Sequence, residues 1–159
     1  MIVRRTHDPD LVRMCVTHPR VWPHVSDDAS PPADLYEPNM AEPMVWLAAT
    51  EGGSVGGVWG YHPHNAVLWE VHTCCLPHWW GPRAVEAARR TLVWMTEHTA
   101  CRKVVTHVPV TNRHAYRFAK RVGMVDEGLN RRSFLKDGTL HDQHLLGITE
   151  EEICQLPPP

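Results

Sequence analysis

The clearest absence in this chain of 159 residues is basic charge from residue 21 to residue 82, where there is neither lysine nor arginine. The same stretch holds seven acidic residues: Asp27, Asp28, Asp34, Glu37, Glu42, Glu51 and Glu70. From Arg83 to Lys136 twelve basic residues face four acidic ones, although the net charge of the chain is only −2. Uneven charge can report on partners, so we expect an acidic half suited to a cationic amine and a basic half suited to a phosphorylated ligand. The alternative is that exposed helices simply carry solvated charges.

Long apolar runs are also absent. No segment approaches the length that spans a membrane, and charged residues interrupt residues 1 to 20, which argues against a signal peptide. We therefore expect a soluble, cytoplasmic protein with no membrane partner. The apolar fraction of 43% is nevertheless enough for a sizeable core, which excludes a disordered chain and fits one domain.

Signatures of disulfides, metals and nucleic acids are missing as well. The five cysteines are odd in number, and the side chains of Cys74 and Cys75 would point to opposite faces of a strand, so we expect reduced, mostly buried thiols. The closest histidine pairs, HPH (62–64) and HDQH (141–144), lack a CxxC or HExxH pattern, and no metal site is predicted. Basic residues without interleaved aromatic residues give no prediction of nucleic-acid binding.

The hydrophobic pattern predicts an α/β fold, in which one mixed sheet carries helices on its faces. We expect the order β-α-(loop/α)-β-β-β-α-β-α-β-β within a single domain of residues 1–149. The first half is expected to contain a strand at 2–6, a helix at 8–18, an irregular acidic and proline-rich segment at 22–43 with one short helix near 33–36, and strands at 44–50, 55–61 and 65–76.

The second half contains the most regular helical pattern. Between residues 82 and 98 the apolar positions are spaced three, four and three apart, and Pro82 suits a first helical turn. A strand at 103–110, a helix at 112–123 and strands at 124–135 and 138–148 follow. Residues 150–159 are expected to form a loose tail.

The turn LPHWWGPRAV (76–85) joins a predicted strand to this predicted helix. Helix N-termini bind phosphate through unpaired N–H groups and the helix dipole, usually with several glycines beside them. This turn has only Gly81, and we expect at least one of Trp79 and Trp80 to be exposed there. It is therefore either an altered phosphate site or a helix start without a ligand.

The chain resembles the GNAT superfamily of acyl-CoA-dependent N-acetyltransferases. WEVHTCCLPHWWGPRA places Glu70, Pro77 and Gly81 as that family does, and NRHAYRFAKRVGMVDEG resembles its later helix. The C-terminal portion EGLNRRSFLKDGTLHDQHLLGITEEE looks more like the branch that acetylates ribosomal proteins, protein N-termini and similar amines. The resemblance implies a GNAT-like, mostly antiparallel twisted sheet, acetyl-CoA as cosubstrate and a homodimer.

The resemblance also implies which residues bind the cofactor. The expected set is Cys74, Cys75, Leu76, Gly81, Pro82, Arg83, Ala84, Asn112 and Ala115. A backbone N–H near Cys75 or Leu76 would polarise the thioester carbonyl, and Asn112 would bind the pantetheine arm. Asn112 is equally well placed as a plain helix cap.

The chain departs from the family pattern at two places, the turn before the helix at 82–98 and the helix at 112–123. The signature turn positions are occupied by Trp80, Arg83 and Val85, so Arg83 and the helix N-terminus would have to replace the lost glycines. The tyrosine that protonates the departing thiolate in many members is replaced by Ala119. Tyr116, one helical turn earlier, is the substitute that we consider.

The catalytic candidates are Glu70, His72 and Tyr116. Burial in an apolar strand would raise the pKa of Glu70 and make it a base, unless the residue lies on the wetter face. His72 shares that face and would relay a proton, although it fits better as a half-buried strand residue, and His107 is open to the same two interpretations. We expect acetyl transfer from acetyl-CoA to a cationic primary amine, such as a peptide N-terminus or a small amine, by direct attack. The rival expectation is a GNAT-fold binding or structural module that has lost catalysis.

Overall fold

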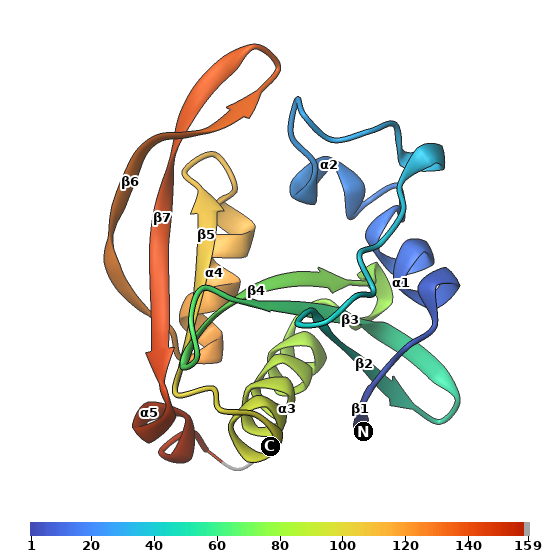
Figure 1. Ribbon diagram of the computed structural model, residues 1–159, viewed down its shortest axis with the longest axis vertical. Coiled ribbons are helices and arrows are strands. Elements are labelled where there is room, and N and C mark those ends of the chain that lie inside the picture. Colours follow the sequence, from blue (N-terminus) through green and yellow to red (C-terminus); the bar gives the residue numbers. More distant parts are fainter. Residues whose placement is uncertain (158–159) are drawn as a thin grey trace.

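The computed structural model of the protein describes residues 1–157, which form one seven-stranded sheet with helices on both faces (Figure 1). The strands lie in the order β1-β2-β3-β4-β5-β7-β6. No helix in these residues is both long enough and apolar enough to cross a membrane.

The order of elements agrees with the prediction. The strands are β1 (Ile2–Arg5), β2 (Val45–Glu51), β3 (Ser54–Pro63), β4 (Leu68–Cys75), β5 (Lys103–Pro109), β6 (Val125–Lys136) and β7 (Thr139–Thr149). The helices are α1 (Pro9–Val16), α2 (Trp22–Val25), α3 (Pro82–His98), α4 (Arg113–Val122) and α5 (Glu150–Cys154), with 3-10 turns η1 (Ala33–Leu35) and η2 (Pro77–Trp79).

The sheet is antiparallel except between β4 and β5. These two strands run parallel and pair only from Leu68↔Lys103 to Glu70↔Val105. Beyond that point β5 continues beside β7, while β4 continues beside β3, so the sheet opens between its two halves. This opening positions the site described below.

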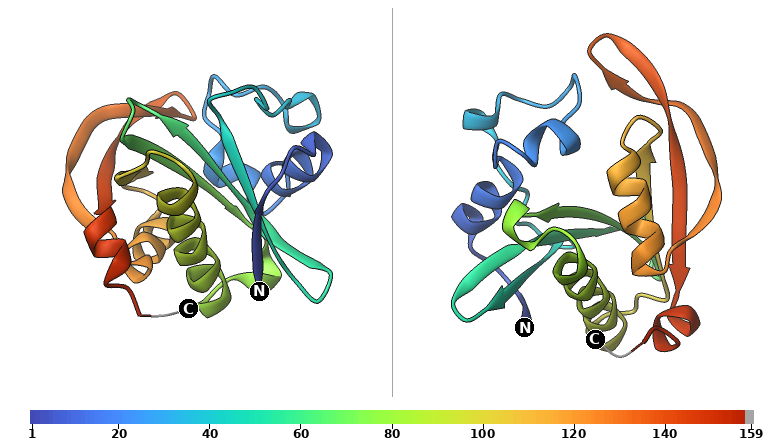
Figure 2. Two further views of the ribbon diagram at one scale, coloured as in Figure 1. Left: turned by 60° about the horizontal axis from the view of Figure 1, so that its bottom comes forward. Right: turned by 180° about the vertical axis from the view of Figure 1, so that it is seen from behind.

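Each face of the sheet has its own apolar core. Trp59, Trp69 and Val71 pack on the face covered by α3 and α4, together with Ala88 and Leu92 of α3. Val58 and Cys74 lie in a second core with α1 on the opposite face. The two layers of helices are visible in Figure 2. All five cysteines are free and four are buried, as the sequence predicted.

The segment after residue 150 differs from the expected loose tail. Thr149 and Glu152 form a reciprocal capping box that starts α5. Ile153 is buried, and Leu156 packs against the main core. The amphipathic pattern of this short helix was overlooked because its apolar contacts come from distant parts of the chain. Residues 158 and 159 of the predicted tail lie outside the described residues.

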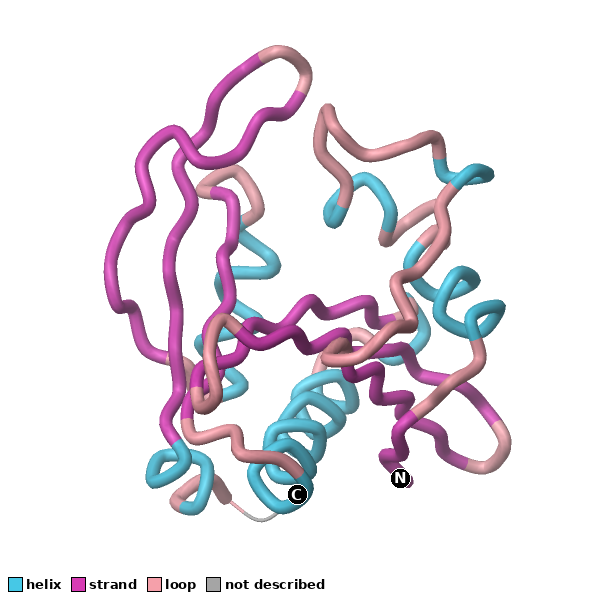
Figure 3. The backbone as a smooth tube through the Cα atoms, viewed as in Figure 1, coloured by secondary structure: helices cyan, strands magenta, loops and turns pink. Residues whose placement is uncertain are grey.

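The proline-rich segment 22–43 is irregular for most of its length (Figure 3), with α2 and η1 as its only helical turns. Its acidic side chains are largely paired, which the charge pattern alone did not indicate. Arg13 binds Glu37, and Arg5 binds Glu42. The segment therefore offers a cationic ligand less free negative charge than the sequence suggested.

A second set of contacts ties this segment to the tip of the β6–β7 hairpin. Asp28 accepts hydrogen bonds from the backbone N–H groups of Asp137 and Gly138, both at 2.8 Å. Lys136 donates to the carbonyl oxygen of Ser26 at 2.9 Å. We call these contacts the clasp. They join parts of the chain about 110 residues apart at one end of the molecule (Figure 1).

Candidate active site

A cleft of about 900 Å³ occupies the opening between β4 and β5. One wall comes from α3 and α4, which cover one face of the sheet, and we call it the helix wall. The other wall comes from residues 20–27, from Glu70 and His72 of β4, and from the β6–β7 hairpin, and we call it the histidine wall. The cleft thus connects the two faces of the sheet through the gap between its halves.

The exposed edge of β4 supplies backbone groups to the cleft. Successive residues of a strand direct their N–H and C=O groups to alternate edges. The carbonyl of Val71 accepts a bond from Thr106 of β5, whereas the N–H of Leu76 donates to Gly56 of β3 at 2.8 Å. By this alternation Thr73 and Cys75 face the β5 edge, where β5 no longer pairs. Leu76, one of the two predicted carbonyl donors, is already engaged.

The N-terminus of α3 borders the same cleft. Gly81 is the cap residue, with φ of 99°, and no side chain caps the helix. The first N–H groups of a helix have no partner within the helix, and Pro82 has none to offer, so those of Arg83 and Ala84 are available to a ligand. Gly81 and Ala84 line the cleft. An anion is favoured at such a position.

Trp79 and Trp80 have opposite roles in this turn. Trp79 is buried and lies so close to Gly56 that a Cβ atom there would meet its ring at 2.0 Å. Trp80 is 46% exposed and lines the cleft, and its ring N–H donates to the carbonyl of Cys75 at 2.8 Å. The predicted exposure of one tryptophan is confirmed. Arg20, which sequence reasoning missed, stacks over the Trp80 ring at 4.6 Å.

Arg83 is not among the residues that line the cleft. Its side chain is 61% exposed and lies 3.6 Å from Glu51, at the end of β2. Pro82 is also outside the lining, and Cys74 points into the core under α1. Of the nine predicted cofactor residues, these three do not contact the cleft, and Leu76 is likewise buried in the α1 core.

The α4 wall is polar at its start, apolar in its middle and carries Arg121 near its end. Asn112 caps α4 by accepting a bond from the N–H of Ala115 at 3.1 Å, and both residues line the cleft. Phe118 and Ala119 line it further along.

Tyr116 does not fit its expected role as an acid. Its hydroxyl donates to Asp126 at 2.9 Å, and its ring packs on His144. It is not among the residues that line the cleft, because these contacts hold its side chain against β6 and β7. The hydrogen bond to Asp126 also raises the pKa of this tyrosine.

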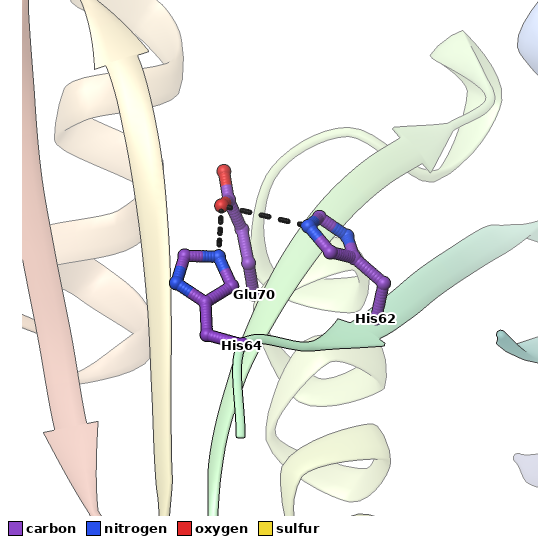
Figure 4. A group of neighbouring side chains, drawn as sticks. All are labelled: His62, His64 and Glu70. Carbon is purple, nitrogen blue, oxygen red and sulfur yellow. Dashed lines mark hydrogen bonds and ion pairs between the residues drawn. The ribbon is translucent and has the colours of Figure 1, made fainter. Parts of the chain in front are cut away.

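Glu70 lies at the point where β4 and β5 part, and histidines surround its carboxylate. His64 and His107 lie at 2.8 and 2.9 Å from its two oxygens, and His62 lies at 3.8 Å. Figure 4 shows His62 and His64 directed at one oxygen of Glu70. The ring of His72 stacks on that of His62 at 5.2 Å. Glu70 itself is only 9% exposed.

The raised pKa expected for Glu70 is wrong. Burial does act to raise the pKa, but the hydrogen bonds from His107 and His64 and the charges of His72 and His107 together lower it. Burial also lowers the pKa of His72, although the neighbouring Glu70 acts in the opposite sense. At neutral pH the cluster therefore combines an ionised carboxylate with a neutral His72.

The sequence contained a signal for this cluster that was not used. His62 lies near the end of β3, and His64 follows directly after the strand ends at Pro63. The register sets His62 opposite Glu70, and Gly60 opposite His72. Pairing the predicted strand 55–61 with the next strand would have brought the HPH motif to Glu70.

Known proteins provide a comparison with this geometry. No protein-family model matches the chain, and no curated protein matches it in sequence. A solved spermidine N-acetyltransferase from Vibrio cholerae, in complex with CoA and spermine, superposes with a TM-score of 0.70 at 17% identity over 96% of this chain and 97% of that chain. A point mutant of a spermidine N-acetyltransferase from Vibrio cholerae gives 0.77 at 16% identity over 96% and 97%.

An acetyltransferase of the GNAT family from Bacillus anthracis is similar over a smaller part, with a TM-score of 0.61 at 20% identity over 71% of this chain and 69% of that chain. The fold is therefore that of the GNAT acetyltransferases, as the sequence predicted. The two Vibrio cholerae structures named above match it over nearly the whole chain.

Proposed function

We propose that the protein transfers an acetyl group from acetyl-CoA to a cationic primary amine by direct attack. The observation that carries this proposal is the cleft between β4 and β5, which joins free backbone groups and a helix N-terminus to a carboxylate with histidines. A structural relative in complex with CoA and spermine supports it. The GNAT fold supports acyl transfer as the reaction class.

In this proposal the cofactor occupies the helix wall. Its pyrophosphate lies at the N-terminus of α3, where Gly81 has no Cβ to intrude and Arg83 adds positive charge from the first turn. The thioester arm lies along the free edge of β4, with the N–H of Cys75 directed at the carbonyl oxygen. Asn112 contacts the arm from the start of α4.

The amine occupies the histidine wall. Ionised Glu70 attracts a cationic acceptor, and His72, which lines the cleft two residues further along β4, receives the proton that the amine must lose. The two Vibrio cholerae relatives are spermidine N-acetyltransferases, which makes polyamines the first acceptors to test. A peptide N-terminus, as in the ribosomal-protein and N-terminal branch, is the second.

Direct attack is favoured over a covalent enzyme intermediate. Cys75 is the cysteine that lines the cleft, and burial raises the pKa of its thiol to about 12, so it remains protonated and unreactive at neutral pH. We assign no side-chain acid to the departing thiolate, because Ala119 occupies that part of α4.

Calorimetric titration with acetyl-CoA tests the cofactor site. Arg83→Glu reverses charge in the first turn of α3 and is expected to weaken binding about tenfold, which corresponds to the dipole and charge effects at helix ends. Arg90→Glu makes the same change two turns later, where the side chain pairs with Glu86 away from the cleft, and should bind as the parent does. Equal loss in both variants would contradict a phosphate at the N-terminus of α3.

Acetylation of spermidine and of short peptides tests the reaction. Glu70→Gln is expected to lower kcat/KM about a hundredfold, the scale of acid–base catalysis. Glu127→Gln is the control, because Glu127 pairs with Lys103 outside the cleft lining. Tight binding of acetyl-CoA without transfer to any amine would favour the inactive binding module instead.

A further inference from the structure

The side chains of His62, His64 and Glu70 form a compact group of ligand atoms. The two imidazole nitrogens and one carboxylate oxygen all lie within 4.8 Å of one another. Glu70 is buried, while the side chains of His62 and His64 are 40% and 36% exposed. Such a group combines a buried carboxylate with two imidazoles that solvent can reach.

The spacing of these atoms suits a small divalent ion. Oε2 of Glu70 lies 2.8 Å from Nε2 of His64 and 3.8 Å from Nε2 of His62. A tetrahedral zinc ion with bonds of about 2.0 to 2.2 Å holds neighbouring ligand atoms about 3.3 Å apart. The two distances lie on either side of that value, so small side-chain rotations bring all three atoms to an ion.

The backbone holds two of these donors in register. His62 lies in β3 and is paired directly with Glu70 of β4, while His64 follows Pro63, the last residue of β3. A site on paired strands is largely formed before the ion arrives, so little ordering opposes binding.

Neighbouring side chains orient the donors in the way that metal sites require. His107 hydrogen-bonds Oε1 of Glu70 at 2.9 Å, which leaves Oε2 directed at His62 and His64 (Figure 4). The ring of His62 is stacked on that of His72, with 9° between the planes. Hydrogen bonds of this kind to metal-binding carboxylates raise metal affinity by about 10- to 100-fold.

We infer that His62, His64 and Glu70 bind a divalent transition-metal ion, with Zn²⁺ the best fit to two imidazoles and one carboxylate. A fourth coordination position remains open to solvent at the rim of the cleft. Binding replaces the hydrogen bond between Nε2 of His64 and Glu70, and the neutral imidazole of His64 then carries its proton on Nδ1. Because the ion takes Oε2 of Glu70, it competes with a cationic amine at the same carboxylate.

The test is calorimetric titration of the chelator-treated full chain with Zn²⁺. We expect one site per chain, and at least a tenfold loss of affinity in His64→Gln. His98→Gln is the matched control, because His98 is exposed and stacks on Trp94 of α3, far from the three ligands in the sequence and on the other face. Thermal unfolding without metal checks that each variant folds as the parent does.

Two further variants keep the inference open to refutation. If His64→Gln fails to fold, His62→Asn replaces it, with the same expected loss. Co²⁺ absorption then reports the coordination, since the tetrahedral spectrum should disappear in the variant and persist in His98→Gln. Zinc binding that is unchanged in the double variant His62→Gln/His64→Gln would place the ion elsewhere and overturn the inference. These readouts measure binding directly, so they do not depend on acetyl transfer.

Discussion

The two walls of the cleft are built in different ways. The helix wall is assembled mainly by neighbours in sequence, because η2 leads directly into α3, and its apolar residues belong to the main core. The histidine wall gathers residues from the 20–27 segment, β4 and the β6–β7 hairpin. Hydrogen bonds from His64 and His107 support its Glu70. The helix wall is therefore positioned by core packing, whereas the histidine wall depends on strand register.

This contrast indicates which wall can accept substitutions without loss of the fold. Core packing fixes the helix wall, so its shape is costly to alter. The histidine wall is held by hydrogen bonds between partly exposed side chains and the buried Glu70, each worth about 1 kcal/mol. Acceptor chemistry can therefore change on the histidine wall while cofactor geometry stays constant.

The largest expected effect comes from the adjacent tryptophans. Trp79→Ala removes a buried ring that packs against Gly56, and we expect the free energy of unfolding to fall by about 3 to 5 kcal/mol. Trp80→Ala, on the exposed side of the same turn, should cost under about 1 kcal/mol. Urea denaturation measures both values. A similar fall in the free energy of unfolding in both variants would show that core packing of Trp79 does not hold the helix wall in place.

A smaller effect on stability is expected at Asn112, where the helix-capping role can be separated from the proposed contact with acetyl-CoA. Asn112→Ala removes the hydrogen bond to the N–H of Ala115 and should destabilise the protein by about 1 kcal/mol. Asn112→Ser keeps a capping oxygen, so its stability should match the parent while acetyl-CoA binding still weakens. Chemical denaturation and titration with acetyl-CoA give the two quantities. Unchanged affinity in Asn112→Ser would leave Asn112 as a cap alone.

The smallest expected effect on global stability concerns the clasp. The backbone N–H groups of Gly138 and Asp137, with the charge of Lys136, lower the pKa of Asp28. A lowered folded-state pKa gives stabilisation that is present above the unfolded value of about 3.9 and lost as pH falls through the folded value. The amide NMR signals of Asp137 and Gly138 should therefore shift only below about pH 4.

Two variants calibrate this titration. Asp28→Ala should show the shifted amide signals already at neutral pH. Asp34→Ala changes a carboxylate of the same segment for which the described residues provide no hydrogen bond, and its spectrum at the hairpin should equal that of the parent. Hairpin signals that do not respond to Asp28→Ala would mean that the clasp is not formed in solution.

The sequence predicted most of the fold because its elements are locally encoded. Residues 82–98 form α3 as expected, since spacing, Pro82 and Gly81 all specify the same helix. The exposure of one of the two adjacent tryptophans followed from their place on a turn, and the structure shows that it is Trp80. Element order and fold class were accordingly correct, whereas α5 was missed because its buried residues contact distant segments.

The site was less predictable for the same physical reason. The charge state of Glu70 depends on His64 and His107, which lie 6 and 37 residues away in the chain. The direction of Tyr116 depends on Asp126. The predicted homodimer, cytoplasmic location and acceptor identity stay predictions.

The opening between β4 and β5 links binding to folding. Backbone groups in a sheet normally satisfy one another, yet Thr73 and Cys75 face an edge from which β5 has diverged. A ligand with its own amide groups, laid in this gap, would act as a short substitute strand and connect the two half-sheets. Its occupancy should therefore raise the melting temperature, with about 2.7 kcal/mol gained at a hundredfold excess over Kd. The melting temperature of this protein should therefore report whether a ligand occupies the gap between β4 and β5.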